Sequence, residues 1–478
     1  MRLPKPVWRI LRSKRFHRAL IVSPFILILG LTCWYWQVNR WGNAKLEHSR
    51  ARLEEFGIPT TNRAVDAYYS TSGACLLTHP DVLALTPTEC DPFTILSKAG
   101  FTDHPDWWGF FSGDATHPPG DLRFLDPKAT DGELSPERAG EILARFTSTD
   151  QSIQGIVEAM ADPSLVVDST TPDHMPHSQW AVVRNINNYL LLRSVLRTKA
   201  GDLDAALADF TTVVDFTGRW QDQSHSAMDS VMLYGVIPYL ADTALILVEH
   251  SQNQPHILDT VDEGMHSIDR VDNLLRGVEF EMGFWFYHFF NGHQSATTLP
   301  ASDMDWDFDW DHDWEDWKST MDDWWWQIRP VGYLKAQMAE AIDLHLDHLT
   351  RTPSGTLRTH ITQADVLDFE AQLQRTGSLS RHTGIQIHAN IIEAAIQNHV
   401  QIHFIRLAIA CERYREAHGR FPETLHQLVP GILPRPLESP VMDHPMEMTP
   451  SPDGNLIFTT ESPDMPDGYK FHYPPTGH

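Results

Sequence analysis

An uninterrupted run of apolar positions lies close to the N-terminus. No charged residue occurs from Ala19 to Asn39, and Ala19–Trp36 reads ALIVSPFILILGLTCWYW. A helix of that length spans about 27 Å, close to the thickness of the hydrocarbon core of a bilayer. Tryptophan and tyrosine at the far end of the run are typical of the headgroup level. The pattern therefore predicts a transmembrane helix over residues 19–39.

Two other kinds of N-terminal segment, a cleaved signal peptide and a lipoprotein signal, also contain an apolar run. A cleaved signal peptide requires small residues at its cleavage site, but the bulky Trp34-Tyr35-Trp36 occupies that place. A lipoprotein signal would lipidate Cys33, but the preceding Gly30-Leu31-Thr32 fits such a signal poorly. An uncleaved membrane anchor is the favoured interpretation.

Charge indicates the orientation of the predicted anchor. The chain carries 37 Lys and Arg against 63 Asp and Glu, a net charge of −26. Residues 1–18 are nevertheless basic and contain no acidic residue. Because basic flanks stay in the cytoplasm, we expect a cytoplasmic N-terminus, a single crossing of the inner membrane and a periplasmic body. The acidic body argues against nucleic acid as a partner.

Beyond the run, the pattern of apolar positions divides the chain into segments. Amphipathic helical spacing alternates with stretches rich in Pro, Gly and Asp. The predicted segments are a cytoplasmic basic tail (1–18), the transmembrane anchor (19–39), a juxtamembrane helix (40–58) ended by Gly57-Ile58-Pro59, an irregular segment with short helices (59–135), a helical body (136–383) that begins at the cap Ser135-Pro136, and a C-terminal module (384–478).

A helical hairpin is predicted around Ala200-Gly201-Asp202. The helix before this turn covers 180–199, and the helix after it has an apolar stripe from Leu203 to Thr217. The start of the second helix is similar to tetratricopeptide-like hairpins, although no repeat array follows. A third helix is expected around 228–249, with a kink at Pro238.

Residues 303–326 combine ten acidic residues with seven tryptophans. Alternation of Asp with aromatic residues is compatible with a strand, but helical spacing of the aromatic positions runs further and favours an amphipathic helix. We expect a buried aromatic stripe or a docking surface for a protein partner in the cell envelope. The candidate interaction residues are Trp306, Trp310, Trp314 and Trp317.

Cys75 and Cys90 flank a loop-like segment in a compartment that is expected to be oxidising. A disulfide between them would close a loop of about 15 residues and add about 3 kcal/mol of stability. Two unrelated buried thiols are an equally favoured alternative, and the sequence does not decide between a disulfide and separate thiols.

Two histidine pairs have helical spacing and are candidate metal ligands: His345 with His348, and His399 with His403. Asp343, Asp347 or His388 would complete such a site. Satisfied helical histidines are the alternative interpretation, since the chain contains no HExxH motif. Nucleophile elbows and phosphate-binding loops are also missing from the sequence, so no cofactor and no catalytic residue is predicted.

The C-terminal module is predicted to begin with a long apolar helix over 384–418, for which Gly419 provides the C-cap. Short strands are expected at 446–448, 456–460 and 469–473, separated by turns at Asp453-Gly454 and Asp467-Gly468. A helix followed by a small antiparallel sheet accounts for this pattern.

The segment ERYREAHGRFPETLHQLVPGILPRPL (residues 412–437) resembles a YRxxHGRYP-type segment that ends many uncharacterised bacterial membrane-anchored proteins. It is also similar to the region after the long helix of the type II secretion major pseudopilin. The resemblance to the uncharacterised family extends to Gly57–Thr60 and to residues 190–210. It implies an N-terminal anchor, a helical body and a pilin-like end, and it carries no catalytic residue across. Ser439-Pro440 replaces the usual Asp-Pro of pseudopilins. Pseudopilins are also shorter and have a prepilin peptidase signal and an early Glu in the apolar segment, which this sequence lacks, so membership in a pseudopilus is not expected.

Together these patterns predict a mainly α protein. It comprises an N-terminal transmembrane helix, a helical-hairpin (tetratricopeptide-like) bundle and a small α+β C-terminal module with a short antiparallel sheet. Non-catalytic binding or scaffolding in the envelope is the leading function. A metal-dependent hydrolase that uses one of the histidine pairs is the first alternative, and a secretion-related pseudopilin-like component is the second.

Overall fold

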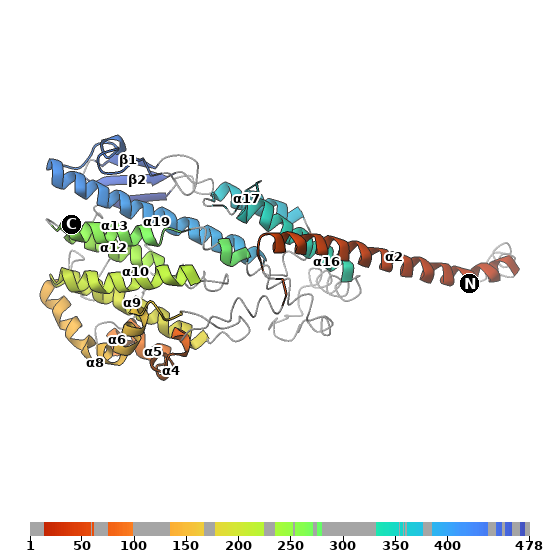
Figure 1. Cartoon of the computed structure of the whole chain (residues 1–478), viewed down its shortest axis with the longest axis horizontal. Coiled ribbons are helices and arrows are strands. Elements are labelled where there is room, and N and C mark those ends of the chain that lie inside the picture. The colour runs from red at the N-terminus through yellow and green to blue at the C-terminus, as the bar shows by residue number, and fades with distance from the viewer. Residues whose placement is uncertain are drawn as a thin grey trace, which may run out of the picture. The chain divides into compact units, whose positions relative to one another are not determined.

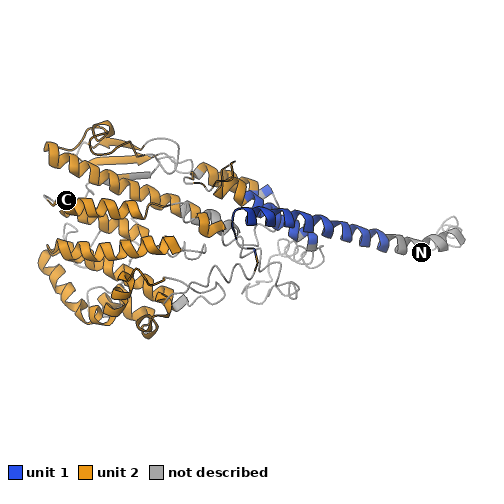
Figure 2. Ribbon diagram, viewed as in Figure 1, with its two compact units in different colours: residues 1–60, 283–344, 373–385 blue, residues 61–282, 345–372, 386–478 orange. Residues whose placement is uncertain are grey.

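The structure is a computed structural model in which two compact units are distinguished (Figure 2). Unit 1 comprises residues 1–60, 283–344 and 373–385, and unit 2 comprises residues 61–282, 345–372 and 386–478. The residues that the structure describes are 14–58, 60–61, 75–98, 134–166, 177–223, 235–251, 254–270, 275–279, 331–352, 354–356, 358, 361–375, 385–437, 446–451, 455–460 and 469–473.

Unit 1 contains one long helix, α2 (Lys14–Glu55), which includes the apolar run and continues into the predicted juxtamembrane helix (Figure 1). It ends where the sequence predicts. Gly57 has a φ of 75°, and Ile58 N–H donates to Leu53 O at 2.9 Å, which is the backbone pattern of a Schellman C-cap.

The transmembrane prediction for residues 19–39 stays a prediction. Within the part of the chain that the structure describes, no helix combines the length and the hydropathy of a membrane span. The side chains of α2 are described from Ile28 onward.

The second helix of unit 1, α16 (Val331–Leu344), lies alongside α2 (Figure 1). Gly332 N–H donates to Asn39 Oδ1 at 2.6 Å, and Arg52 Nη1 lies 2.8 Å from Asp343 Oδ1 near the other end. The two helices therefore run parallel. They cross with their backbones in contact, because a Cβ added at Gly42 would overlap the backbone of Gly332.

Unit 2 is built around a bundle of helices. Their bounds are α8 (Pro136–Ala161), α9 (His177–Lys199), α10 (Leu203–Gln223), α12 (Ile237–His250) and α13 (Pro255–Ser267). Shorter elements precede or follow them: η1 (Leu76–Thr78), α4 (Pro80–Ala84), α5 (Pro87–Cys90), α6 (Pro92–Lys98) and the π-helical turn η3 (His345–Thr350). Helix α17 (Gln363–Arg375) also lies largely in this unit.

The predicted hairpin is formed by α9 and α10. Gly201 adopts a φ of 85°, and Asp202 N–H reaches back to Arg197 O at 2.9 Å, so the turn is again a Schellman motif. At the open end of the hairpin, the rings of Trp180 and Trp220 stack with centroids 4.4 Å apart. Both rings are almost fully buried, and each contributes on the order of 2–3 kcal/mol of hydrophobic stabilisation.

The structure bears on two predictions that involve prolines, the cap of α8 at Ser135-Pro136 and the kink at Pro238. Ser135 caps α8, because its hydroxyl accepts a hydrogen bond from Arg138 N–H, and this prediction is confirmed. The predicted kink at Pro238 is wrong. Helix α12 begins at Ile237, so Pro238 lies in the first turn, where its missing N–H costs no helical hydrogen bond.

The C-terminal module has the predicted architecture. Helix α19 (Ile385–His418) ends at Gly419, which has a φ of 72°, and the short helix η4 (Leu425–Gln427) follows. Strands β1 (Glu447–Pro450), β2 (Leu456–Thr460) and β3 (Tyr469–Tyr473) form an antiparallel sheet in the order β1-β2-β3. The predicted turns at 453–454 and 467–468 lie outside the described residues.

Aromatic stacking attaches this sheet to α19. The ring of Phe404 on α19 stacks on Phe471 of β3 with centroids 5.5 Å apart and on Phe458 of β2 at 6.2 Å. Phe458 is fully buried, and so is Tyr473 on the same face of the sheet. The apolar length of α19 is therefore explained in part by its role as the support of the sheet.

Candidate functional site

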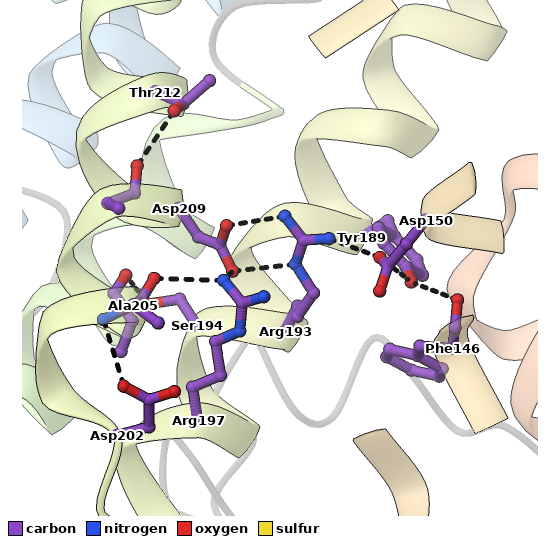
Figure 3. Close-up of polar contacts among 12 residues, drawn as sticks. Phe146, Asp150, Tyr189, Arg193, Ser194, Arg197, Asp202, Ala205, Asp209 and Thr212 are labelled. Carbon is purple, nitrogen blue, oxygen red and sulfur yellow. Dashed lines mark hydrogen bonds and ion pairs between the residues drawn. The ribbon is translucent and has the colours of Figure 1, made fainter. Parts of the chain in front are cut away.

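The most extensive buried polar arrangement that we find joins α8, α9 and α10 (Figure 3). We call its five residues the three-helix charge network: Asp150, Tyr189, Arg193, Arg197 and Asp209. Arg193 Nε and Nη2 donate to the two oxygens of Asp209 at 2.8 and 2.6 Å. Arg197 Nη1 donates to Asp209 Oδ2 at 2.8 Å.

The other side of Arg193 faces α8. Its Nη1 donates to Asp150 Oδ1, which also accepts the hydroxyl of Tyr189 at 2.8 Å. Burial alone would lower the pKa of Arg193, but the two carboxylates outweigh it and raise that pKa, so the guanidinium stays charged. Because the side chains of the network take one another as partners, it cross-links three helices rather than presenting a reactive group.

The second arrangement contains the predicted pair His399 and His403. Both lie on α19, one turn apart, and both contact a carboxylate that the sequence did not indicate, Asp269, just after α13. His399 Nδ1 contacts Asp269 Oδ1, and His403 Nε2 lies 3.1 Å from Asp269 Oδ2. Arg406 Nη1 lies 3.7 Å from the same carboxylate.

These contacts control the ionisation of Asp269. Burial alone would raise its pKa, but the hydrogen bonds from His399 and His403 outweigh this effect and hold the pKa well below its usual range. Asp269 is therefore a carboxylate that accepts from two imidazoles. A carboxylate in this role fixes the ring orientation and the tautomer of each histidine.

The same face of α19 continues as a series of ion pairs with α13. Arg413 Nη1 and Nη2 lie 2.7 and 2.8 Å from Asp262 and Asp259, and Arg406 Nε lies 3.4 Å from Asp262. The histidine pair is thus one end of an interhelical row of basic groups on α19 against acidic groups of the α13 region.

No metal centre is formed in the described part of the chain. No group of three or more His, Cys, Asp or Glu side chains there has the arrangement needed to hold a metal ion. Of the residues proposed to complete a site, the two whose side chains are described, Asp343 and Asp347, form no such group with the histidines. Asp343 accepts from Ser49 and Arg52 within unit 1, Asp347 is exposed, and the side chain of His388 lies outside the described residues.

The other predicted pair, His345 and His348, does not share a site. His345 is buried, and its ring packs edge-on against Phe369 at 4.6 Å. His348 is on the surface, with Nδ1 3.0 Å from Asp368 Oδ2. The reason is local: these residues form a π-helical turn, in which a spacing of three no longer places two side chains on one face.

Cys75 and Cys90 are not joined to each other in the structure. The backbone of Cys75 forms an isolated bridge with Val166, and Cys90 ends α5, where its Sγ lies 3.6 Å from Val182 O. Burial raises the pKa of the Cys90 thiol to about 12. Of the two interpretations left open by the sequence, the arrangement corresponds to separate buried cysteines.

The tryptophans Trp306, Trp310, Trp314 and Trp317 lie outside the described residues. Their role as interaction residues stays a prediction from the sequence.

Comparisons with known proteins found no match to this chain, whether among protein-family models, curated proteins or solved structures. The resemblance to pseudopilin-like and membrane-anchored proteins therefore stays a prediction from its motifs.

Proposed function

We propose that this protein is a membrane-anchored envelope protein that binds or scaffolds a protein partner and does not transform a substrate. In this proposal α2 crosses the inner membrane once, the N-terminus is cytoplasmic, and the rest of the chain is periplasmic. The observation that carries the proposal is a row of large apolar side chains exposed along α2.

The exposed fractions of these side chains are high. Ile28, Leu29 and Trp36 are 60%, 65% and 63% exposed, and Leu31, Trp34 and Tyr35 are also on the surface. Soluble surfaces rarely carry so many neighbouring apolar groups, and the identities of these residues suit hydrocarbon followed by an interfacial belt. A lipid bilayer is the partner that would cover them.

The polar groups of this stretch also suit a bilayer. Thr32 donates its hydroxyl to Ile28 O at 2.8 Å, so its hydrogen bond is satisfied within the helix, as a lipid environment requires. At the end of the run, the guanidinium of Arg40 lies over the ring of Trp36 with Cζ 5.6 Å from the centroid. Such a pair is typical of the boundary between hydrocarbon and headgroups.

The non-catalytic part of the proposal is supported by how the conspicuous polar residues are used. Arg193, Asp209 and Asp150 connect helices to one another. The carboxylate of Asp269 contacts one imidazole nitrogen of His399 and one of His403. The geometry therefore gives less support to a metal-dependent hydrolase that uses this pair. Nothing in the geometry adds support to a secretion-related role.

Alkaline carbonate extraction of bacterial membranes tests the anchor. We expect the full chain to stay in the membrane pellet, and the variant Leu29→Arg with Leu31→Arg to move to the supernatant. Leu83→Arg is the matched control, because Leu83 is 55% exposed on the short helix α4, and it should stay in the pellet. Extraction of the full chain, or retention of the double variant, would contradict the proposal.

Crosslinking in the native envelope tests the scaffold. The full chain should capture a defined protein partner. A variant with alanine at Trp306, Trp310, Trp314 and Trp317 should lose it while remaining in the membrane. Failure of the well-expressed full chain to capture any protein would count against scaffolding.

A further inference from the structure

The first turn of α16 lies beside a defined position of α2, close to Asn39. Gly332 N–H donates to Asn39 Oδ1 at 2.6 Å, and one turn later Lys335 Nζ donates to Asn43 Oδ1 at 2.8 Å. Further along, Lys45 pairs with Glu340. The separation in residue number between the paired residues stays between 291 and 295 along the two helices, so their register changes little.

The two glycines at the crossing explain how the register is kept. A Cβ at Gly332 would overlap the backbone of Asn39, and a Cβ at Gly42 would overlap the backbone of Gly332. Backbones that approach this closely leave little freedom for one helix to slide along the other, because a shift of one residue would bring a side chain into the contact. Val331 is therefore fixed close to the level of Asn39.

This level is where the apolar run ends. Asn39 follows Trp36 by three residues, a rise of about 5 Å, and the headgroup layer of a bilayer is about 5–7 Å deep on each side. Exposed aromatic groups of both helices gather here: Trp36, Trp41 (44% exposed) and, on α16, Tyr333 (38% exposed). Cations accompany them, with Arg40 over Trp36 and Lys45 Nζ 4.9 Å from the centroid of Trp41.

We infer that the first turn of α16 lies in the phospholipid headgroup layer beside Trp36 and Trp41. Two helices of this chain, rather than the anchor alone, then contact the membrane surface. The phenol of Tyr333 suits the boundary between hydrocarbon and headgroups, and the ammonium of Lys335 and the guanidinium of Arg40 suit lipid phosphates. This inference rests on the proposed anchoring by α2, and it adds that a segment almost 300 residues away in the chain returns to the bilayer.

Depth measurements with nitroxide spin labels test this inference. The full chain, with Cys33→Ala to remove the exposed thiol, is reconstituted in vesicles of phosphatidylethanolamine and phosphatidylglycerol. Labels are placed one at a time at Tyr333→Cys and Lys335→Cys on α16. Labels at Ile28→Cys, Arg40→Cys and Glu47→Cys provide reference depths along α2. The Cys33→Ala parent without an introduced cysteine, treated with the same reagent, controls for labelling of the buried native cysteines.

We expect the label at 333 to match the depth of the label at 40, and the label at 335 to lie slightly further out, close to the level of Asn43, but still deeper than the label at 47. Glu47 lies about 16 Å beyond Trp36 along the helix and is expected in water. Labels at 333 and 335 that are as accessible to a water-soluble nickel chelate as the label at 47 would overturn the inference.

The label at 28 separates the two proposals. If it reports the hydrocarbon core while 333 and 335 report water, only the placement of α16 fails. If it reports water as well, the anchor fails too. Gly42→Leu serves as a further check, because it should move the labels at 333 and 335 into water. Gly30→Leu should leave them in place, since a Cβ at Gly30 meets no atom within 4 Å.

Discussion

Tyr473, in the last strand, donates its hydroxyl to Glu412 Oε1 on α19 at 2.8 Å. The other carboxylate oxygen of Glu412 is held by Arg415 at 2.6 Å, and both partners in the first bond are buried. The sheet is thus attached to the long helix by one charged hydrogen bond as well as by ring stacking. This contact ties the position of β3 to Glu412 in addition to the stacked rings of Phe404 and Phe471.

Tyr473→Phe should therefore destabilise the C-terminal module. A hydrogen bond to a charged group contributes about 1.5–3 kcal/mol, and the buried carboxylate would lose one of its partners. Urea unfolding followed by circular dichroism measures the change. Tyr333→Phe, which alters an exposed tyrosine on α16, should be neutral, and an equal loss for both variants would contradict this account.

Arg193→Ala should be among the most destabilising single substitutions in unit 2. It leaves Asp209, whose side chain is 7% exposed, and Asp150 without the guanidinium between them. Removal of one partner from a buried ion pair costs about 3–5 kcal/mol.

The matched control for this variant is Arg138→Ala. Arg138 pairs with Glu141 on the surface of α8, where such a pair contributes about 0–1 kcal/mol. Comparable losses of unfolding free energy in the two variants would show that the three-helix charge network does not stabilise the bundle.

Asp269 should make stability depend on pH in the acid range. Its pKa in the folded protein is lowered by His399 and His403, so its contribution is fully present above the unfolded value of about 3.9. The contribution is lost progressively as the pH falls below that value, toward the lower pKa of the folded state.

Asp269→Asn removes this linkage. In the window just below about pH 3.9, the free energy of unfolding of the variant should fall less steeply, by up to about 1.4 kcal/mol per pH unit. Asp204→Asn controls for the loss of one negative charge, because its side chain is 90% exposed. Parallel curves for wild type and Asp269→Asn would refute the assignment.

Gly42→Ala should destabilise the pairing of α2 with α16, although alanine is the better helix former. The added methyl group would overlap the backbone of Gly332, so the helices must separate and weaken the Lys45–Glu340 and Arg52–Asp343 pairs. Gly140→Ala on α8 should have the opposite effect and raise the free energy of unfolding by about 0.5–1 kcal/mol, since no atom lies within 4 Å of the new methyl group. Thermal unfolding of the two variants in detergent distinguishes the signs.

Local features of this fold are determined by the sequence itself. Helices α2, α9 and α19 are terminated by Gly57, Gly201 and Gly419, because glycine adopts positive φ without a steric penalty. Ser135-Pro136 begins α8 for an equally local reason, and strands β2 and β3 have the bounds that their alternating pattern predicts. The caps depend on hydrogen bonds between residues a few positions apart, and β2 pairs with β3, whose partner residues lie 9–17 positions further along the chain.

Only the tertiary structure decides which distant groups meet. His399 and His403 can be recognised as a pair, but their partner Asp269 is 130 residues away in the chain and lies just beyond the end of another helix. The sequence places Arg193 and Asp209 in the two predicted helices of the hairpin, without showing that they pair or that Asp150 of α8 completes their network. His345 and His348 lie in a π-helical turn, a local change of helix type that their spacing does not predict. The first two cases share one physical reason. Side-chain spacing defines the faces of a helix, whereas the packing of one helix against another determines which faces come into contact.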